Sequence, residues 1–507
     1  MTLQEKIADY VRLILHKFNK TINNNIEINE SMNRLDTITK NQIWYRGEQF
    51  EIKQMFSQAP EYFGSESFWI KGANSKKIAT RHYPLPQVII DTMTSICAND
   101  IQDIEISDND VLNDLLNKIL KDSDELEFHE ENIKEQLISG DCGVFPKFYQ
   151  SGKITWELVK SENCEYSDTN EEWYVKQIYQ KNNKNFVLVT TFGRGYVRYN
   201  LFTENGTEVS IDEIEKLKGL QDIVFEKDGK IDEDLCLFVL FKAFCSPKFS
   251  GRGKSIYENR DDAFDFVDEV YSTWGAANRK STPKTFVDKS MLKKDKNGNV
   301  IEYSDYDVDL VQLGSANTMN GQQGVTNYNP SFPSNDYYQT LNMAIQSALV
   351  QILSPTTAGI DMRTYQTNVN TSYTQEIEKI TIQTHNKILY NYADSLKKLI
   401  LVTFKCYSYL TDSEIDFDEL EENITIVFND FSTPSDDKVI PLIVQAVNAG
   451  IMSTEEAIRE WHTDWNDVQI QEEIARIKSE RPTFGTDATL FGIDDEQIEN
   501  DNQIIEE

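Results

Sequence analysis

The residues most suggestive of chemistry are Gly251-Arg252-Gly253-Lys254-Ser255, a glycine-rich run that follows an apolar segment and is expected to open a helix. This is the setting of a phosphate-binding loop, in which backbone N–H groups and a lysine surround nucleotide phosphates. The full pattern needs a further glycine for the tight turn, but Lys248 stands at that position. Asp430, after the apolar run Ile424–Phe428, is only a loose match to a magnesium-binding acid. A flexible, glycine-rich lead-in to a helix is the favoured interpretation.

Acidic residues offer two further candidates for chemistry. Asp305, Asp307 and Asp309 alternate, so on a strand they would share one face that could hold a divalent cation. A solvated acidic strand is the favoured interpretation. Glu51-Ile52-Lys53 matches half of a metal-dependent nuclease motif, but the sequence offers no convincing partner acid.

Cysteines and histidines do not gather in metal-ligand patterns. The six cysteines form no CxxC pair, and the five histidines form no HExxH motif. Scattered cysteines in a long chain are typical of reduced core thiols. The sequence therefore predicts no metal, no cofactor and no catalytic residues, and the chain is not expected to be an enzyme.

Composition restricts the possible partners. Fifty Lys and Arg stand against 84 Asp and Glu, which gives a net charge of −34 over 507 residues. Such a balance argues against coating nucleic acid, which needs a basic footprint, and against docking on an anionic membrane. The sequence contains no run of about 20 apolar residues, so it predicts no transmembrane helix. Residues 1–18 do not resemble a signal peptide.

The elements that must position any site change along the chain. Residues 1–135 are expected to be mostly helical, and 144–245 to form a meandering antiparallel sheet. Asn205-Gly206 is a strong hairpin-turn signal. A capping box at Ser255-x-x-Glu258 then predicts a helix start. Its apolar stripe is Phe264, Val267, Tyr271 and Trp274, at helical spacing.

Strands return after Pro283, over 284–288 and 300–313, followed by a Gly/Asn/Ser/Pro loop over 314–335. A second helix is expected at 336–353, ended by Pro355, and a polar loop at 354–370. A third helix over 371–410 would be roughly 60 Å long. A second capping box, Ser453-x-x-Glu456, marks a later helix, and the tail 494–507 is expected to be disordered.

One segment runs against the overall charge. Seven cations and two acids lie between Arg279 and Lys296, and seven minus two gives +5. The segment begins at a helix end and continues into a small strand unit, so a docking or DNA-facing role and an ordinary solvated surface both stay open. Its cations are Arg279, Lys280, Lys284, Lys289, Lys293, Lys294 and Lys296.

The order of sheet, helix, small strand unit, helix, polar loop, long helix and acidic end resembles the portal proteins (head-tail connectors) of tailed double-stranded DNA bacteriophages, of the siphovirus type. Gly253-Lys254-Ser255 opens the first helix of this pattern. The segment 274–280 leads into 283–287, and 424–430 is followed by Asp436-Asp437. Gly450-Ile451-Met452-Ser453 then precedes a helix, and the last helix ends near Glu480. The order and spacing carry the resemblance, over nearly the whole chain.

The resemblance implies an α+β, mainly helical fold with the wing, stem, clip and crown of a portal. Its implied parts are a wing (1–250), a stem helix (251–280), a clip (281–335), a second stem helix (336–353), a tunnel loop (354–370), a long wing helix (371–410), a crown (411–480) and an acidic tail (481–507). Within the tunnel loop, Met362, Arg363 and Tyr365 would face DNA.

The resemblance also implies partners and location. The chain would form a homo-oligomeric ring, usually a dodecamer, at one capsid vertex of the virion, assembled in the host cytoplasm. Double-stranded DNA would pass through the ring non-specifically during packaging and ejection. The terminase large subunit, a head-completion or adaptor protein, and the major capsid and scaffolding proteins would dock on it, with no membrane involved.

Two other functions stay open at this point. A phosphate-loop packaging ATPase or nuclease would rest on Gly253-Lys254-Ser255 and Asp430. A minor capsid structural protein is the other alternative, but the long helix and the paired helices around a strand unit favour the portal.

Overall fold

The computed structural model describes the chain from residue 33 to residue 476, with gaps. The described ranges are 33–72, 78–107, 109–149, 151–167, 170–182, 184–227, 230–281, 284–288, 310–313, 325–328, 331–355, 357–358, 371–411, 413, 415–428, 452–461, 470 and 474–476. The chain divides into two compact units, and the boundary falls between residues 429 and 430. The second contains α14 (Thr454–Trp461), where Ser453 Oγ accepts a hydrogen bond from Glu456 N at 3.1 Å, as the capping box predicts.

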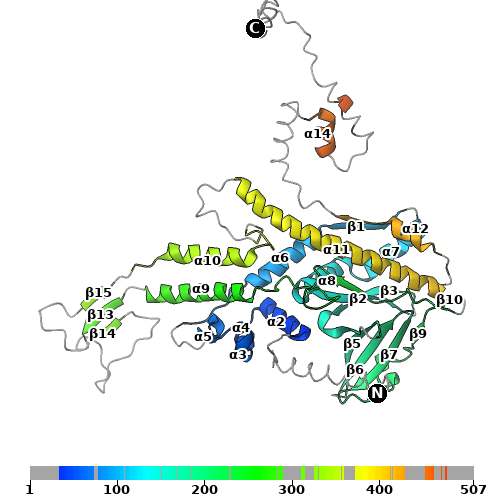
Figure 1. Cartoon of the computed structure of the whole chain (residues 1–507), viewed down its shortest axis with the longest axis horizontal. Coiled ribbons are helices and arrows are strands. Elements are labelled where there is room, and N and C mark those ends of the chain that lie inside the picture. Colours follow the sequence, from blue (N-terminus) through cyan, green and yellow to red (C-terminus); the bar gives the residue numbers. More distant parts are fainter. Residues whose placement is uncertain are drawn as a thin grey trace, which may run out of the picture. The chain divides into compact units, whose positions relative to one another are not determined.

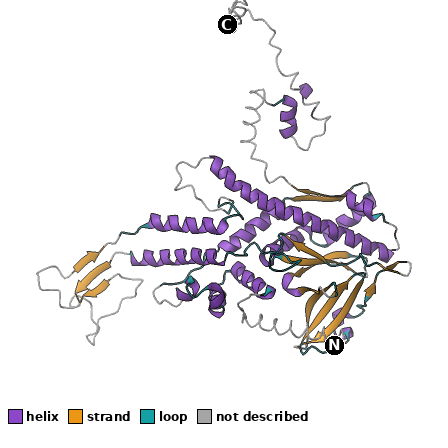
Figure 2. Cartoon of the chain, viewed as in Figure 1, coloured by secondary structure: helices purple, strands orange, loops and turns teal. Residues whose placement is uncertain are grey.

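Helices make up most of the N-terminal part of the first unit (Figures 1 and 2). The first helix among the described residues, α2, begins after Asn33, whose side chain accepts from Asp36 N, and ends at Gly47 with φ 68°. The elements in this part are α2 (Arg34–Arg46), α3 (Gln49–Gln58), α4 (Pro60–Phe63), α5 (Phe68–Lys71), α6 (Leu85–Asn99), β1 (Ile101–Ile106), α7 (Asp110–Asp122) and α8 (Glu125–Ser139).

Two antiparallel sheets follow, which confirms the predicted meander. The first has the order β12-β2-β3, with strands Val239–Lys242, Asp141–Phe148 and Ile154–Lys160. The second has the order β4-β5-β6-β7-β8, with strands Cys164–Ser167, Glu172–Lys181, Lys184–Gly193, Tyr196–Thr203 and Glu208–Val209. Strand β9 (Ile223–Val224) also pairs with β7, and β10 (Glu226–Lys227) pairs with β11 (Lys230–Ile231).

A pair of helices carries a small sheet between them in sequence. Helix α9 (Asp261–Lys280) packs side by side with α10 (Ser334–Leu349), and Figure 1 shows the pair extending away from the rest of the first unit. Strands β13 (Lys284–Asp288), β14 (Leu310–Leu313) and β15 (Val325–Tyr328) form a three-stranded sheet with β13 in the middle. Strand β14 runs parallel to β13, and β15 runs antiparallel to it.

The longest helix, α11 (Thr371–Thr411), has 41 residues, as predicted within one residue. It crosses the first unit beside α6, β2 and β12. After it, α12 (Phe417–Asn423) leads into β16 (Ile424–Phe428), which pairs antiparallel with β1. One core joins these parts: buried apolar residues of α2, α6, α8, α9, α10 and α11 belong to a single cluster.

The mixture of helices and antiparallel sheets confirms the α+β class, but several boundaries were wrong. Helix α9 begins at Asp261, not at 255, because Ser255 and Glu258 lie in a turn before it. Helix α10 ends at Leu349, well before Pro355. Gln351, just after the end of the helix, has a φ of 62°. Strand β15 lies in the predicted loop 314–335, and β1 interrupts the predicted helical region.

Candidate functional site

The helix pair α9–α10 is the most distinctive candidate for a functional element. Both helices contribute apolar side chains to one buried core: Phe264 and Val267 on α9, and Leu341 and Ile345 on α10. Of the predicted stripe of α9, Phe264 and Val267 are buried, and Tyr271 and Trp274 are partly buried against the same core. On the same two helices, the side chains of Phe266 and Met343 are 45 % and 70 % exposed. The pair thus buries one apolar face and presents further large apolar side chains to its surroundings.

Charge is distributed unevenly along α9. Its first turn carries Asp261 and Asp262, and its last turn carries Arg279 and Lys280, both exposed. Acids near the N-terminus and cations near the C-terminus each complement the helix dipole. Lys284 is the first residue of β13. The remaining predicted cations, Lys289, Lys293, Lys294 and Lys296, lie outside the described residues, as do Met362, Arg363 and Tyr365.

Three buried aspartates on α9 fasten the helix pair to the N-terminal segment, an arrangement that the sequence analysis missed. Asp261, Asp265 and Asp268 follow one another at i, i+4 and i+7, so they share a helix face. The first accepts hydrogen bonds from Lys40 Nζ at 2.5 Å and from Trp44 Nε1 at 2.9 Å. Both donors lie on α2, so Asp261 joins α2 to the start of α9.

Asp265 holds α5 through backbone donors. Its two carboxylate oxygens accept from Phe68 N at 2.8 Å and Trp69 N at 3.1 Å. Burial raises the pKa of Asp265 to about 6, and the two backbone hydrogen bonds oppose that shift. The free N–H groups at the start of a four-residue helix are thus satisfied by a carboxylate from a different helix.

Asp268 holds the segment that leads into α6. Its carboxylate accepts from Trp69 Nε1 at 3.0 Å and Tyr83 N at 2.7 Å, and His82 Nδ1 lies 2.9 Å away. Burial raises the pKa of Asp268, although His82 and the other donors counteract it. One turn further along α9, Ser272 Oγ accepts from Arg81 N at 2.8 Å. Asp261, Asp265, Asp268 and Ser272 of α9 therefore bind α2, α5 and the segment 81–83.

Arg260 joins the two helices of the pair at their base. It precedes α9, and its guanidinium donates from Nη1 to Ala348 O at 2.9 Å and from Nη2 to Val350 O at 2.6 Å. These carbonyls lie at the C-terminal end of α10, where cations are favoured. The end of α10 is thus capped by the residue that precedes α9.

Polar contacts also attach α11 along most of its length. Each joins a side chain of α11 to a different part of the first unit. They are Ser354 N to Thr381 Oγ1 (2.7 Å), Asp100 Oδ2 to His385 Nε2 (2.7 Å), Asn391 Nδ2 to Ala243 O (2.7 Å), His129 Nδ1 to Tyr392 OH (2.6 Å), Trp156 Nε1 to Thr403 Oγ1 (3.1 Å) and Tyr409 OH to Asp232 Oδ2 (2.9 Å).

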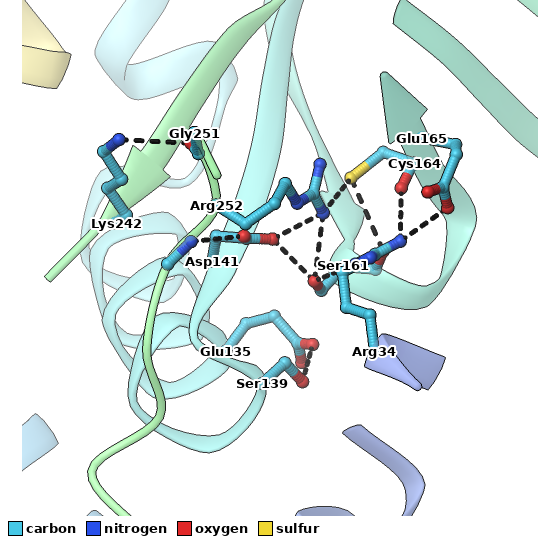
Figure 3. Close-up of polar contacts among 11 residues, drawn as sticks. Arg34, Glu135, Ser139, Asp141, Ser161, Cys164, Glu165, Lys242, Gly251 and Arg252 are labelled. Carbon is cyan, nitrogen blue, oxygen red and sulfur yellow. Dashed lines mark hydrogen bonds and ion pairs between the residues drawn. The ribbon is translucent and has the colours of Figure 1, made fainter. Parts of the chain in front are cut away.

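The glycine-rich run is a packed junction, and not the flexible lead-in that the sequence suggested. Figure 3 shows Arg252 turned inward, where its Nη2 lies 2.8 Å from Asp141 Oδ1. The other oxygen of Asp141 accepts from Gly253 N at 2.8 Å, and Ser161 Oγ donates to Oδ1 at 2.6 Å. Arg34 donates to Ser161 and, at 2.8 Å, to Glu165 on β4. The junction joins α2, β2, β4 and the segment before α9.

Two glycines make this junction possible. Gly140 has a φ of 101°, and a Cβ placed on Gly253 would lie only 1.9 Å from Gly140 O. The backbones therefore approach closer than any side chain would allow. The cleft beside them, lined by Gly253, Lys254 and Ser255, has a volume of about 20 Å³. Such a space holds a water molecule and not a nucleotide.

The hydroxyl of Ser255 also makes hydrogen bonds within the protein. Its hydroxyl donates to Leu137 O at 2.9 Å and accepts from Tyr257 N at 3.1 Å, whereas a phosphate-binding loop needs this hydroxyl for magnesium. Asp430 lies outside the described residues. Across the part of the chain that the structure describes, no three His, Cys, Asp or Glu side chains gather in a way that could hold a metal ion. Within that same part, no helix is long and apolar enough to cross a bilayer.

Comparisons with known proteins give only distant structural similarity. No family model matches the sequence, and no curated protein does. A chain in the virion of a native gene transfer agent particle aligns at 13 % identity and a TM-score of 0.36, over 74 % of this chain and 88 % of that chain. A chain in the neck of the empty particle, computed with C6 symmetry, gives 14 % and 0.37 over 75 % and 90 %.

A chain in the neck of the native particle, computed with C12 symmetry, gives 13 % identity and a TM-score of 0.35, over 75 % of this chain and 89 % of that chain. These TM-scores are low, and none of the three structures assigns a role to this chain.

Proposed function

We propose that this chain is a portal-type subunit: several copies form a ring-shaped channel at one vertex of a phage capsid, through which DNA is packaged and ejected. The observation that carries the proposal is the helix pair α9–α10, which extends from the first unit, bears a small sheet between its helices and keeps Phe266 and Met343 exposed. Exposed apolar side chains on both helices need a partner surface, and head-to-tail copies around an axis supply one.

The anchoring of the pair supports this role. Asp261, Asp265, Asp268 and Arg260 hold the base of the pair to the N-terminal segment and hold the two helices to each other. A ring that conducts DNA needs stem helices that keep their position while the polymer moves past them. The buried carboxylates of Asp261, Asp265 and Asp268 supply contacts of that kind.

Charge supports the passage of DNA. With a net charge of −34 per chain, twelve copies would carry about −408, and a lumen with few cations would not hold phosphates tightly. Arg279, Lys280 and Lys284 stand at the sheet end of the pair, so this part is proposed as the clip that meets the terminase and the adaptor protein. The wing, tunnel loop and crown, the DNA-facing role of Met362, Arg363 and Tyr365, and the location in the virion belong to the same proposal.

A double substitution tests the ring. Purified wild-type protein should form rings with a central hole in negative-stain images, and Phe266→Glu with Met343→Glu should leave a folded monomer of about the chain mass. Val111→Glu with Leu126→Glu is the matched control, because both side chains are exposed on α7 and α8. A wild-type protein that stays monomeric by sedimentation at all salt concentrations would refute the proposal.

No observation favours the ATPase alternative. The cleft beside Gly253 is too small for a nucleotide, and the hydroxyl of Ser255 is occupied by the backbone. Saturable ATP hydrolysis by the pure protein would reverse this ranking.

A further inference from the structure

Helix α9 has an exposed face on which an aromatic side chain stands between two carboxylates. Asp262, Phe266 and Glu269 follow one another at i, i+4 and i+7, so they share a helix face, and all three are exposed. We call them the acid-flanked face. They lie on the other side of the helix from the buried Phe264 and Val267. A second acidic surface would be repelled here, so the partner of this face must be uncharged or basic.

Helix α10 has an exposed face of a different kind. Gln339, Met343 and Ser347 follow one another at i, i+4 and i+8 and are exposed, and Val350, directly after the helix, is 54 % exposed. We call these four residues the uncharged face. Residues 337–360 contain no Asp, Glu, Lys or Arg, although 26 % of the whole chain is charged. An exposed surface that is apolar and uncharged is typical of a contact with a partner.

The two faces match each other turn by turn. On α9 the carboxylates stand one turn before and one turn after Phe266. On α10 the polar groups of Gln339 and Ser347 stand one turn before and one turn after Met343. A contact of Met343 with Phe266 is favourable in itself, and it places a neutral hydrogen-bond donor opposite each carboxylate. Neutral donors hold a carboxylate within the chain as well, at Asp265.

A second copy of this chain is the partner that carries both faces. Two acid-flanked faces would bring four carboxylates together. Two uncharged faces could pair about a two-fold axis, but that contact closes as a dimer and leaves the acid-flanked faces uncovered. Pairing of unlike faces from successive copies covers both faces and continues around a ring.

The base of the helix pair sets the height of this contact. Arg260, directly before α9, donates to the carbonyls of Ala348 and Val350, so α9 begins beside the end of α10 and the two helices run antiparallel (Figure 1). Phe266 lies six residues after Arg260, and Met343 lies five residues before Ala348, so the two side chains are at a similar height. Copies in a closed ring are related by rotation without a shift along the axis. In a ring whose axis runs along the pair, Met343 of one copy is therefore level with Phe266 of the next.

Two further charged side chains stand on these faces, at the end that leads to the small sheet. Asp336 is in the first turn of α10, and Lys280 is the last residue of α9. Lys280 follows Asp262 by about five full turns, so it shares the acid-flanked face. Because Asp336 and Lys280 have opposite signs, they do not oppose the pairing of the two faces.

We propose that the uncharged face of α10 packs on the acid-flanked face of α9 of the next copy, with Met343 on Phe266. The two hydrogen-bonded pairs across this contact are Asp262 with Ser347 and Glu269 with Gln339. The inference rests on the ring proposed above. It adds which surfaces form the ring, and it assigns the polar part of the contact to neutral donors and not to ion pairs.

Charge substitutions at Gln339 test the proposal by sedimentation velocity on the full chain. Gln339→Glu places a carboxylate opposite Glu269 of the next copy and should raise the concentration needed for half-maximal ring assembly by at least about tenfold. Gln339→Lys should not weaken assembly, because the lysine meets the same carboxylate. Adding Glu269→Lys to Gln339→Glu should bring assembly back to within about threefold of the wild type.

Asn117→Glu is the matched control, because Asn117 is exposed on α7, outside the helix pair, and the variant has the same net charge as Gln339→Glu. It should assemble as the wild type does, and an equal loss in both variants would overturn the proposal. A wild-type protein without rings refutes the ring itself. Wild-type rings with equally good assembly of Gln339→Glu would leave the ring standing and overturn this contact. A loss that Glu269→Lys does not restore would mean that α10 meets a surface other than α9, and the proposal would be wrong.

Discussion

Two buried sites in the first unit handle carboxylate charge in different ways. At the glycine-rich junction, Asp141 faces the guanidinium of Arg252 at 2.8 Å, so one charge compensates the other. On α9, Asp265 is held by two backbone N–H groups, and burial raises its pKa to about 6. A cation neutralises a buried carboxylate, whereas neutral donors only solvate it. The junction should therefore be sensitive to substitution, and the α9 site should be sensitive to pH.

The largest expected effect is at the junction. Gly253→Ala would place a Cβ 1.9 Å from Gly140 O, and backbone cannot yield as a flexible side chain does. We expect a loss of more than about 3 kcal/mol, or no folded protein. Gly251→Ala is the control: its φ is 73°, but nothing lies within 4 Å of the new Cβ, so the cost should be only about 1 kcal/mol. Thermal unfolding of both variants would measure this, and equal midpoints would refute the close-packing argument.

Removal of the compensating cation should have the next largest effect. Arg252→Met leaves Asp141 buried without its charge partner, which typically costs about 3–5 kcal/mol. Asp141 keeps donors from Gly253 N and Ser161 Oγ, so the lower end of that range is expected. Adding Asp141→Asn to the same chain should recover part of the loss. A double-mutant cycle without coupling between the two positions would show that the pair is not a unit.

At the α9 site, we expect the stability of the folded protein to depend on pH. Since the folded-state pKa of Asp265 is raised above its ordinary value of 3.8 to about 6, the stability it contributes is present at low pH and is lost as the pH rises through about 6. The window is roughly pH 4 to 6, worth up to about 3 kcal/mol. Asp265→Asn should flatten the stability profile in this window.

Asp262→Asn is the matched control, because Asp262 is exposed on the same helix turn. It should leave the profile unchanged. Asp268, whose pKa is also raised by burial, stays in both variants and keeps a slope of the same sign. If Asp265→Asn and Asp262→Asn give the same profile from pH 4 to 7, the α9 carboxylates are not the pH-sensitive part of the molecule.

Periodic patterns could be predicted from the sequence, and long-range contacts could not. The apolar stripe of α9, the 41-residue α11 and the Asn205-Gly206 hairpin depend on residues close in sequence, which is why they were found. The partners of Asp265 and Asp268 lie nearly 200 residues away, so nothing local identified them. The spacing of the three aspartates is local, but the same spacing is typical of a solvated helix face.

The glycine-rich run is a second case in which the local sequence could not predict a long-range contact. Its local pattern suggested a lead-in to a helix, but its geometry depends on Gly140, more than 100 residues earlier. Strands β1 and β15 were missed because one follows a helix directly and the other lies in a polar, Asn- and Gly-rich stretch. In both cases pairing with a distant or neighbouring strand overrides weak local preference.

The smallest expected effect is at Lys254, and it separates the structural function of the junction from a chemical one. Lys254 N donates to Phe244 O at 2.8 Å through the backbone, which any residue except proline can do. Its side chain is half-buried beside a cleft of about 20 Å³. Lys254→Ala should therefore change the thermal midpoint by no more than an ordinary surface substitution, within about 0.5 kcal/mol. It should also leave ring formation intact, because the contacts of Arg252 and Gly253 with Asp141 do not involve this side chain.

A phosphate-binding lysine would behave differently: its loss would abolish nucleotide binding at full stability, and isothermal titration with ATP would detect that. Heat from saturable ATP binding that disappears in Lys254→Ala would give the junction a chemical function that its packing argues against.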